Sequence, residues 1–283
     1  MTAHFCVPSQ TAFMSSTSYG KIILTETKEI SGRKFPIAPK EIQNKIPRCF
    51  AQEEHNEILL SLSLTDSVPI YMGGWFSIEE GIPMKNLNGV FRPSLNALDK
   101  NYEVSKISKY DIEKSVVPFL ELKKDIKDRL AIPLTRLNRA IRPRSPVDKA
   151  IDIGIALESL FFSDSGKMDQ ISYTFRLRGA WLLGVNSEKR KILIQIFQRL
   201  YDCRSKAVHS GMLSDKIKIK GQKPFDSVRF LDIGIKACKL AIEQIINNKF
   251  FPDWDEITLG VPFTGNSEVQ DKVERLLENL AKG

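Results

Sequence analysis

The sequence predicts an α+β protein in which a β-rich N-terminal region, residues 1–108, precedes an α-helical domain, residues 109–283. Two observations predict this division. Before residue 110, short segments alternate apolar and polar residues, and prolines at positions 36, 39, 47, 69, 83 and 93 argue against long helices. After residue 110, apolar residues recur every three or four positions, which is the spacing of amphipathic helices.

Three segments of the N-terminal region are candidate strands. In residues 57–67, EILLSLSLTDS, three leucines alternate with two serines, which is the period of a half-buried strand. Residues 20–30, GKIILTETKEI, form a second candidate, and residues 71–83, YMGGWFSIEEGIP, form a third. The first 20 residues show no periodicity. We therefore expect a β-rich region of undefined topology with a sensor or regulatory role.

The C-terminal region reads as a series of helices separated by polar or glycine-containing breaks. Residues 110–130 form an amphipathic segment with a kink or early break at Pro118. Ser145, Pro146 and Asp148 together mark a helix start, because serine caps, proline suits the first turn and an acid suits the positive helix end. Further helices are expected over residues 147–162, 168–184, 188–211, 226–248 and 268–282, with Ser187 opening the third and Ser267 capping the last.

Composition excludes several classes of protein. The chain has 283 residues, 42% hydrophobic and 27% charged, as expected for one or two globular domains. No apolar run approaches the roughly 20 residues of a membrane span, and no secretory signal is visible. The four cysteines are scattered, without the spacing of a metal site. We expect a cytoplasmic protein with reduced thiols that uses no metal and no cofactor and does not bind membranes.

The positive charge is unevenly distributed. The formal net charge is +8, and the run from residue 129 to residue 144 holds five arginines and no acid. Arginine donates hydrogen bonds to phosphate in a fixed fork, so Arg139, Arg142 and Arg144 are candidate RNA contacts. A solvated helix and linker face explains the same run equally well.

One short stretch combines an arginine and a histidine near an expected helix end. In residues 201–211, YDCRSKAVHSG, Arg204 precedes His209, one of three histidines in the chain, and Gly211 closes the helix. Side chains five positions apart on a helix differ in direction by about 140°, so this pair does not share a face. They can converge through their length, through distortion at the helix end, or by facing a second copy of the same helix.

Residues 144–211 resemble the HEPN domains, specifically the ApeA-like branch of antiphage defence proteins. The resemblance is carried by DKAIDIGIALESLF, SYTFRLRGAWLLG and the R-x4-H stretch LYDCRSKAVHSG. It implies a HEPN-type helical bundle, a homodimer formed through the R-x4-H helix, and metal-independent RNA cleavage by Arg204 and His209. It also implies abortive infection in response to a trigger, which could be phage-derived.

The residue types suit this chemistry. An imidazole can accept or donate the proton of an RNA 2′-hydroxyl near neutral pH, and a guanidinium can stabilise the charged transition state. The resemblance also implies supporting roles for Glu158 and Ser205, since the family has an acid near the R-x4-H helix and often a polar residue after the arginine. Glu158 then either orients Arg204 or is a simple surface acid. Asp202, which also flanks Arg204, is a further supporting candidate. Arg176 and Arg178 diverge on a helix, so we expect one of them to reach an acid or an RNA phosphate.

Two functions remain open on the sequence. One is a metal-independent endoribonuclease, and the other is a non-catalytic HEPN module that binds RNA, nucleotide or a partner protein. The intact R-x4-H pair favours the enzyme, because a binding module has no chemical need for a histidine at that position.

Overall fold

A computed structural model describes residues 26–30, 33–37, 57–58, 60–65, 110, 112–142, 144–162, 170–261, 263 and 265–281. By its contacts the chain divides into two units. One comprises Met1–His55 and Tyr71–Lys106, and the other comprises Asn56–Ile70 and Ile107–Gly283. The second unit therefore takes in a segment that the sequence assigns to the N-terminal region.

Two strands are described in the first unit. β1 (Glu26–Ile30) pairs antiparallel with β2 (Arg33–Ile37), with Glu26 opposite Ile37 and Ile30 opposite Arg33. β1 overlaps the end of the candidate strand at residues 20–30. The rest of that candidate, and the whole candidate at residues 71–83, lie outside the described residues, as do Cys6 and Cys49.

The strand expected at residues 57–67 is wrong. Residues 57–58 and 60–62 are helical and continue into a turn. The hydroxyl of Ser61 donates to the carbonyl of Ile58 at 2.8 Å, and that of Ser63 donates to the carbonyl of Leu60. Both serines are buried beside Leu62 and Leu64. Local hydroxyl–carbonyl bonds let serine be buried in a helical turn, so the leucine–serine alternation reflects no strand here.

The second unit is helical, as the sequence predicts. The amphipathic segment expected at residues 110–130 is not one continuous helix. A π-helical turn η3 (Ile112–Val116) leads into the short α4 (Val117–Leu120), with Pro118 in the first turn of α4. The chain then becomes extended at Lys123 before the long α5 begins. The later helices are α5 (Lys124–Ile141), α6 (Pro146–Phe161), α7 (Ile171–Leu183), α8 (Ser187–Ser210), α9 (Ser227–Asn248), α10 (Trp254–Thr258) and α11 (Ser267–Ala281).

Side-chain caps fix several helix starts. Ser145 caps α6 by accepting the amide N–H of Asp148 at 3.1 Å, as predicted. Asn186 caps α8 through the amide of Lys189 at 2.9 Å. The expected cap of α11 is wrong by one residue, since Asn266, not Ser267, accepts the amide of Glu268 at 2.9 Å. The longer asparagine side chain reaches the first free N–H groups from just outside the helix.

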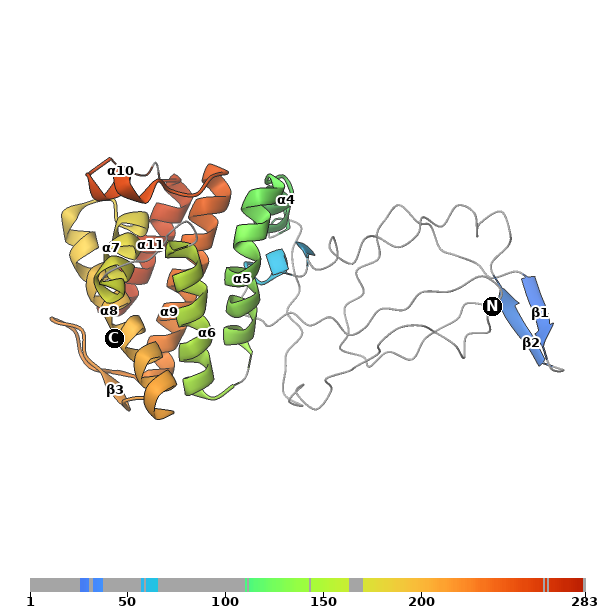
Figure 1. Cartoon of the computed structure of the whole chain (residues 1–283), viewed down its shortest axis with the longest axis horizontal. Helices are drawn as coiled ribbons and strands as arrows, with labels where there is room; N and C mark the ends of the chain where they lie inside the picture. Colours follow the sequence, from blue (N-terminus) through green and yellow to red (C-terminus); the bar gives the residue numbers. More distant parts are fainter. Residues whose placement is uncertain are drawn as a thin grey trace. The chain divides into compact units, whose positions relative to one another are not determined.

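The helices form a bundle in which α6 and α9 are central (Figure 1). α6 packs between α5 and α8, α7 lies against α8, and α9 contacts α5, α6, α7, α8 and α11. Three buried phenylalanines join α6, α7 and α8: the ring of Phe161 lies 5.3 Å from that of Phe175 and 5.6 Å from that of Phe197, in edge-to-face contacts. This packing sets the position of α6 relative to α8, the helix that carries Arg204 and His209.

Between α8 and α9, at a lysine-rich break between two expected helices, the chain forms a two-stranded hairpin. β3 (Lys216–Ile217) pairs antiparallel with β4 (Phe225–Asp226), with Ile217 opposite Phe225. Both partners of that pair are buried. No helix in the described part of the chain is long and apolar enough to cross a membrane.

Candidate functional site

The last two turns of α8 present Arg204 and His209 in different surroundings. Cys203 and Ala207 are buried and hold this end of the helix to the bundle. Gly211 ends it in the left-handed conformation with φ 66°, and its amide N–H donates to the carbonyl of Ala207 at 3.1 Å. Glycine adopts this φ without strain, so α8 ends at Ser210, one residue after His209.

Arg204 lies across α6 at a glycine. A Cβ atom at Gly154 would lie 2.6 Å from the Cβ atom of Arg204 and closer still to its Cγ. Real Cβ atoms do not approach this closely, so any larger residue at position 154 would push Arg204 or α8 away. The missing side chain of Gly154 therefore creates the space in which the aliphatic part of Arg204 lies.

One turn beyond Gly154, Glu158 receives the guanidinium. Nη2 of Arg204 donates to Oε2 of Glu158 at 3.0 Å, and both side chains are about three-quarters buried. Burial raises the pKa of Glu158, and the charge and hydrogen bond of Arg204 oppose that rise. Nε of Arg204 is buried and has no hydrogen-bond partner among the described residues. Glu158 thus fixes one edge of the Arg204 guanidinium at a largely buried position.

His209 follows Arg204 by five residues, near the end of α8. It is exposed and makes no hydrogen bond or ion pair with the described residues. The neighbouring apolar residues Val208 and Met212 are also exposed, at 51% and 67%. Arg204 thus packs on α6 whereas His209 is exposed, and a five-residue spacing on one helix favours such different directions.

The two residues that flank Arg204 differ in their contacts. Asp202 accepts from Nη1 of Arg199 at 3.1 Å and from the side-chain amide of Gln198 at 2.9 Å. Its carboxylate is therefore held on α8 itself. Ser205 is half-buried and lies one turn before His209, on the same side of the helix.

The two arginines of α7 bind within the protein. Arg178 is buried, donates to the carbonyl of Phe161, and stacks with its guanidinium 5.0 Å from the ring of Trp254. Arg176 is half-buried and donates to the side-chain oxygen of Gln198 at 2.6 Å. Because Arg178 satisfies a core carbonyl, we do not include it in an RNA surface.

Three arginines of the run at residues 129–144 surround a buried acid that no local sequence pattern indicates. Asp152 on α6 has a side chain only 3% exposed. Its carboxylate lies 2.9 Å from Nη1 of Arg136, 3.6 Å from Nε of Arg139 and 4.0 Å from Nη1 of Arg144. A buried carboxylate needs such partners, so two of the candidate RNA contacts already serve it. Arg142 is half-buried at the end of α5.

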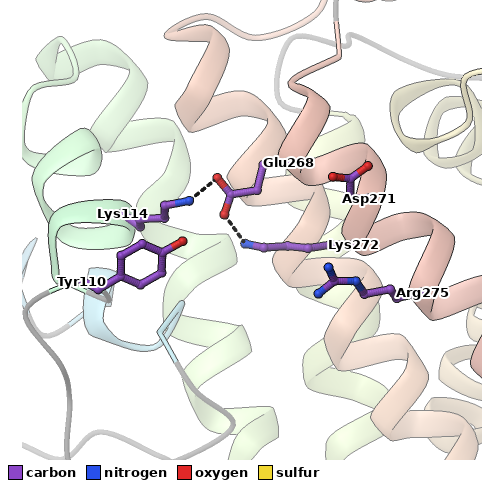
Figure 2. Close-up of a pocket in the computed structure, with 6 residues that line it drawn as sticks. All are labelled: Tyr110, Lys114, Glu268, Asp271, Lys272 and Arg275. Atoms are coloured by element: carbon purple, nitrogen blue, oxygen red, sulfur yellow. Dashed lines mark hydrogen bonds and ion pairs between the residues drawn. The ribbon is translucent and has the colours of Figure 1, made fainter.

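A shallow polar hollow of about 280 Å³ lies elsewhere, between the start of the helical segment and α11 (Figure 2). Its charges are largely paired: Nζ of Lys114 lies 2.5 Å from Glu268, and Nζ of Lys272 lies 3.8 Å from Glu268 and 2.7 Å from Glu243. The first of these ion pairs joins η3 to α11, and the pair of Lys272 with Glu243 joins α11 to α9. None of the candidate catalytic, supporting or RNA-binding residues lines the hollow, and we assign it a structural role.

Among the described residues, no group of three or more histidine, cysteine, aspartate or glutamate side chains could hold a metal ion. Comparison of this chain with protein-family models, with curated proteins and with solved structures gives no match. Any function must therefore be argued from the residues and from their geometry. The structure adds Gly154 to the candidate site. An isolated glycine inside an apolar helix is the sequence signal that could have indicated it.

Proposed function

We propose that this protein is a metal-independent endoribonuclease of the HEPN type that cleaves RNA in the cytoplasm as part of antiphage defence. The observation that carries the proposal is the placement of Arg204, which lies over Gly154 and is bound by Glu158, five residues before an exposed His209. A positioned guanidinium and an accessible imidazole on one helix end are the two groups that this cleavage requires.

The mechanism begins with the RNA's own 2′-hydroxyl. His209 removes its proton, the 2′-oxygen attacks the adjacent phosphorus, and the bond to the 5′-oxygen of the next nucleotide breaks. The products are a 2′,3′-cyclic phosphate and a 5′-hydroxyl end, and the leaving oxygen takes a proton from an imidazolium or from water. Arg204 stabilises the added negative charge on the phosphoryl oxygens. Glu158 positions Arg204 and does not touch the RNA.

A second copy of the chain completes the site in this proposal. Arg204 faces α6 and His209 faces solvent, so an imidazole from one copy would work beside a guanidinium from the other. The exposed Val208 and Met212 flank His209 and supply apolar area for an isologous contact between the two α8 ends.

The site is tested by two substitutions on the full chain. Arg204→Ala and His209→Ala should each abolish cleavage of a single-stranded RNA while the helical circular dichroism stays unchanged. His209 is exposed, so its replacement should also leave the free energy of unfolding within about 0.5 kcal/mol of the native value. Full activity in either folded variant would reject the assignment.

The shared site is tested by mixing the two inactive variants after co-refolding. Random pairing makes half of the dimers mixed, and each mixed dimer has one site with both native residues. About a quarter of native activity should therefore return. If both groups act within a single copy, no activity returns, and the dimeric arrangement is wrong.

A further inference from the structure

The hairpin after α8 carries a row of lysines that the proposed cleavage chemistry does not use. In residues 216–220, Lys216, Lys218 and Lys220 are exposed, whereas Ile217 and Ile219 are buried. We call residues 216–223 the lysine ribbon. The buried isoleucines hold its inner side to the core, so the alternating lysines all project from its outer side.

The ribbon is attached along α8. Two residues before it, the hydroxyl of Ser214 accepts from Nζ of Lys206 at 2.8 Å. Further along, Nε of Arg199 donates to the carbonyl of Lys218 at 3.0 Å, and the amide N–H of Lys220 donates to Oε1 of Gln195 at 2.8 Å. The partners on α8 recede from 206 to 199 to 195 as the ribbon advances. The ribbon therefore runs antiparallel to α8 and starts beside the helix end that bears His209.

Among the described residues, the lysines of the ribbon form no ion pair; Asp226 lies opposite Lys216 in the hairpin, and its carboxylate accepts the amide N–H of Arg229. The arginines of residues 129–144 differ, because three of them form ion pairs with Asp152, and Arg199 is paired with Asp202. A fixed row of unpaired cations is electrostatically costly for an isolated protein and favourable beside a polyanion.

We propose that the lysine ribbon binds the sugar–phosphate backbone of single-stranded RNA and leads it to the His209 end of α8. This inference rests on the proposed function. Lys216 and Lys218, as alternate residues of an extended segment, are about 6.6 Å apart, a spacing comparable to that of neighbouring phosphates along an extended RNA strand, and Lys220 follows where the turn begins. Lysine contacts phosphate as a point charge and reads no base, so the ribbon contributes affinity without sequence preference.

The test measures binding separately from cleavage. The probe is a fluorescent 12-nucleotide RNA methylated at every 2′-oxygen, which cannot undergo the proposed attack. Fluorescence anisotropy gives its affinity for the full chain over a series of salt concentrations. The test variant replaces Lys216, Lys218 and Lys220 by glutamine. The matched control replaces Lys123, Lys236 and Arg275, three exposed cations of other helices and of the α5 start, by glutamine.

Each phosphate contact on a single strand contributes about 0.7 to the slope of log affinity against log salt, so the ribbon variant should lose about 2 from that slope. Its affinity at low salt should fall roughly tenfold. The control should retain the native slope and affinity. If the ribbon and control variants bind alike, or if the native chain does not bind the probe, the inference is wrong.

Two further outcomes separate this inference from neighbouring ones. A poly-glutamate peptide of matched length that displaces the probe as well as unlabelled RNA does would show recognition of acidity in general and would overturn the inference. Ribbon-dependent binding in a protein that cleaves no RNA would reject the nuclease and support the ribbon as an RNA-binding surface. RNA cleavage by the native protein, with no effect of the ribbon variant on binding, would support the nuclease and reject the ribbon as an RNA-binding surface.

Discussion

Gly154→Ala tests whether Arg204 needs its position over α6. The added methyl group would lie 2.6 Å from Cβ of Arg204, well inside ordinary contact, and closer still to Cγ. The side chain of Arg204, or the α6–α8 spacing, must therefore change. The carboxylate of Glu158, 3.0 Å from Nη2 in the native protein, then no longer meets the guanidinium at the same place.

Two opposing effects set the change in stability. Overpacking a well-packed contact costs about 1–3 kcal/mol. Replacing a helical glycine by alanine returns about 1 kcal/mol through the lower entropy of the unfolded chain and better helix propensity. We therefore expect a net loss of about 0–2 kcal/mol. The effect on RNA cleavage should be larger, since a shift of about 1 Å in a charge-stabilising group can cost 10²-fold in rate.

Gly234→Ala is the matched control. A Cβ at Gly234 on α9 would also meet a neighbour at 2.6 Å, but that neighbour is Cδ2 of Leu200. Both variants are compared by urea unfolding, followed through the helical circular dichroism, and by the initial rate of RNA cleavage. Gly234→Ala should keep most of the rate at a similar stability. Equal rates in the two variants would refute the role assigned to the space above Gly154.

Three further predictions follow from the buried polar groups. Burial raises the pKa of Glu158 above its ordinary 4.5, so protonation of Glu158 stabilises the folded protein at low pH, and this stabilisation is lost as the pH rises through the raised pKa. The Glu158→Gln variant should therefore become more stable relative to the native protein as the pH rises from 4 to 7, as measured by urea unfolding. A relative loss of stability over this range would contradict the reasoning. Asp152→Asn should lower the free energy of unfolding by about 1–3 kcal/mol, because it removes the negative charge that three arginines share. Arg144→Ala should cost less than half as much, because Arg144 lies at the longest of the three distances from Asp152. Equal losses in the two variants would argue against the role of Asp152 as the shared partner of the three arginines. Burial raises the pKa of Cys203 to about 11 and that of Cys238 to about 12, so at pH 8 iodoacetamide should modify both thiols only when the protein unfolds. Mass spectrometry of the peptides measures the modification. Rapid modification of Cys203 in the native protein would show instead that the C-terminal end of α8 opens.

Local sequence signals predict most of the helical unit because its helices are amphipathic and have distinct ends. The Ser145–Asp148 cap and the Gly211 terminus are present where predicted. The segment at residues 57–65 was assigned wrongly because alternation alone cannot distinguish a strand from a turn in which serine bonds to the preceding carbonyls. The hairpin was missed because two residues per strand give too short a pattern.

The candidate site could be predicted in part. The pairing of Glu158 with Arg204 is one of the two alternatives that the sequence leaves open, and it is the one the structure contains. The role of Gly154 depends on how closely α6 and α8 approach, and single-helix patterns carry no such information. Likewise, Asp152 appears as one acid in an apolar helix until the bundle brings α5 against α6 and places three arginines around it.

The chemical ends left on RNA test the central proposal most directly. The full chain is incubated in EDTA with a single-stranded RNA and, separately, with DNA of the same sequence, and the fragments are identified by mass spectrometry. We predict fragments that end in 2′,3′-cyclic phosphate and begin with 5′-hydroxyl from RNA alone, and none from the His209→Ala variant. Cleavage that requires added magnesium, or that proceeds equally on DNA, would contradict attack by the 2′-hydroxyl.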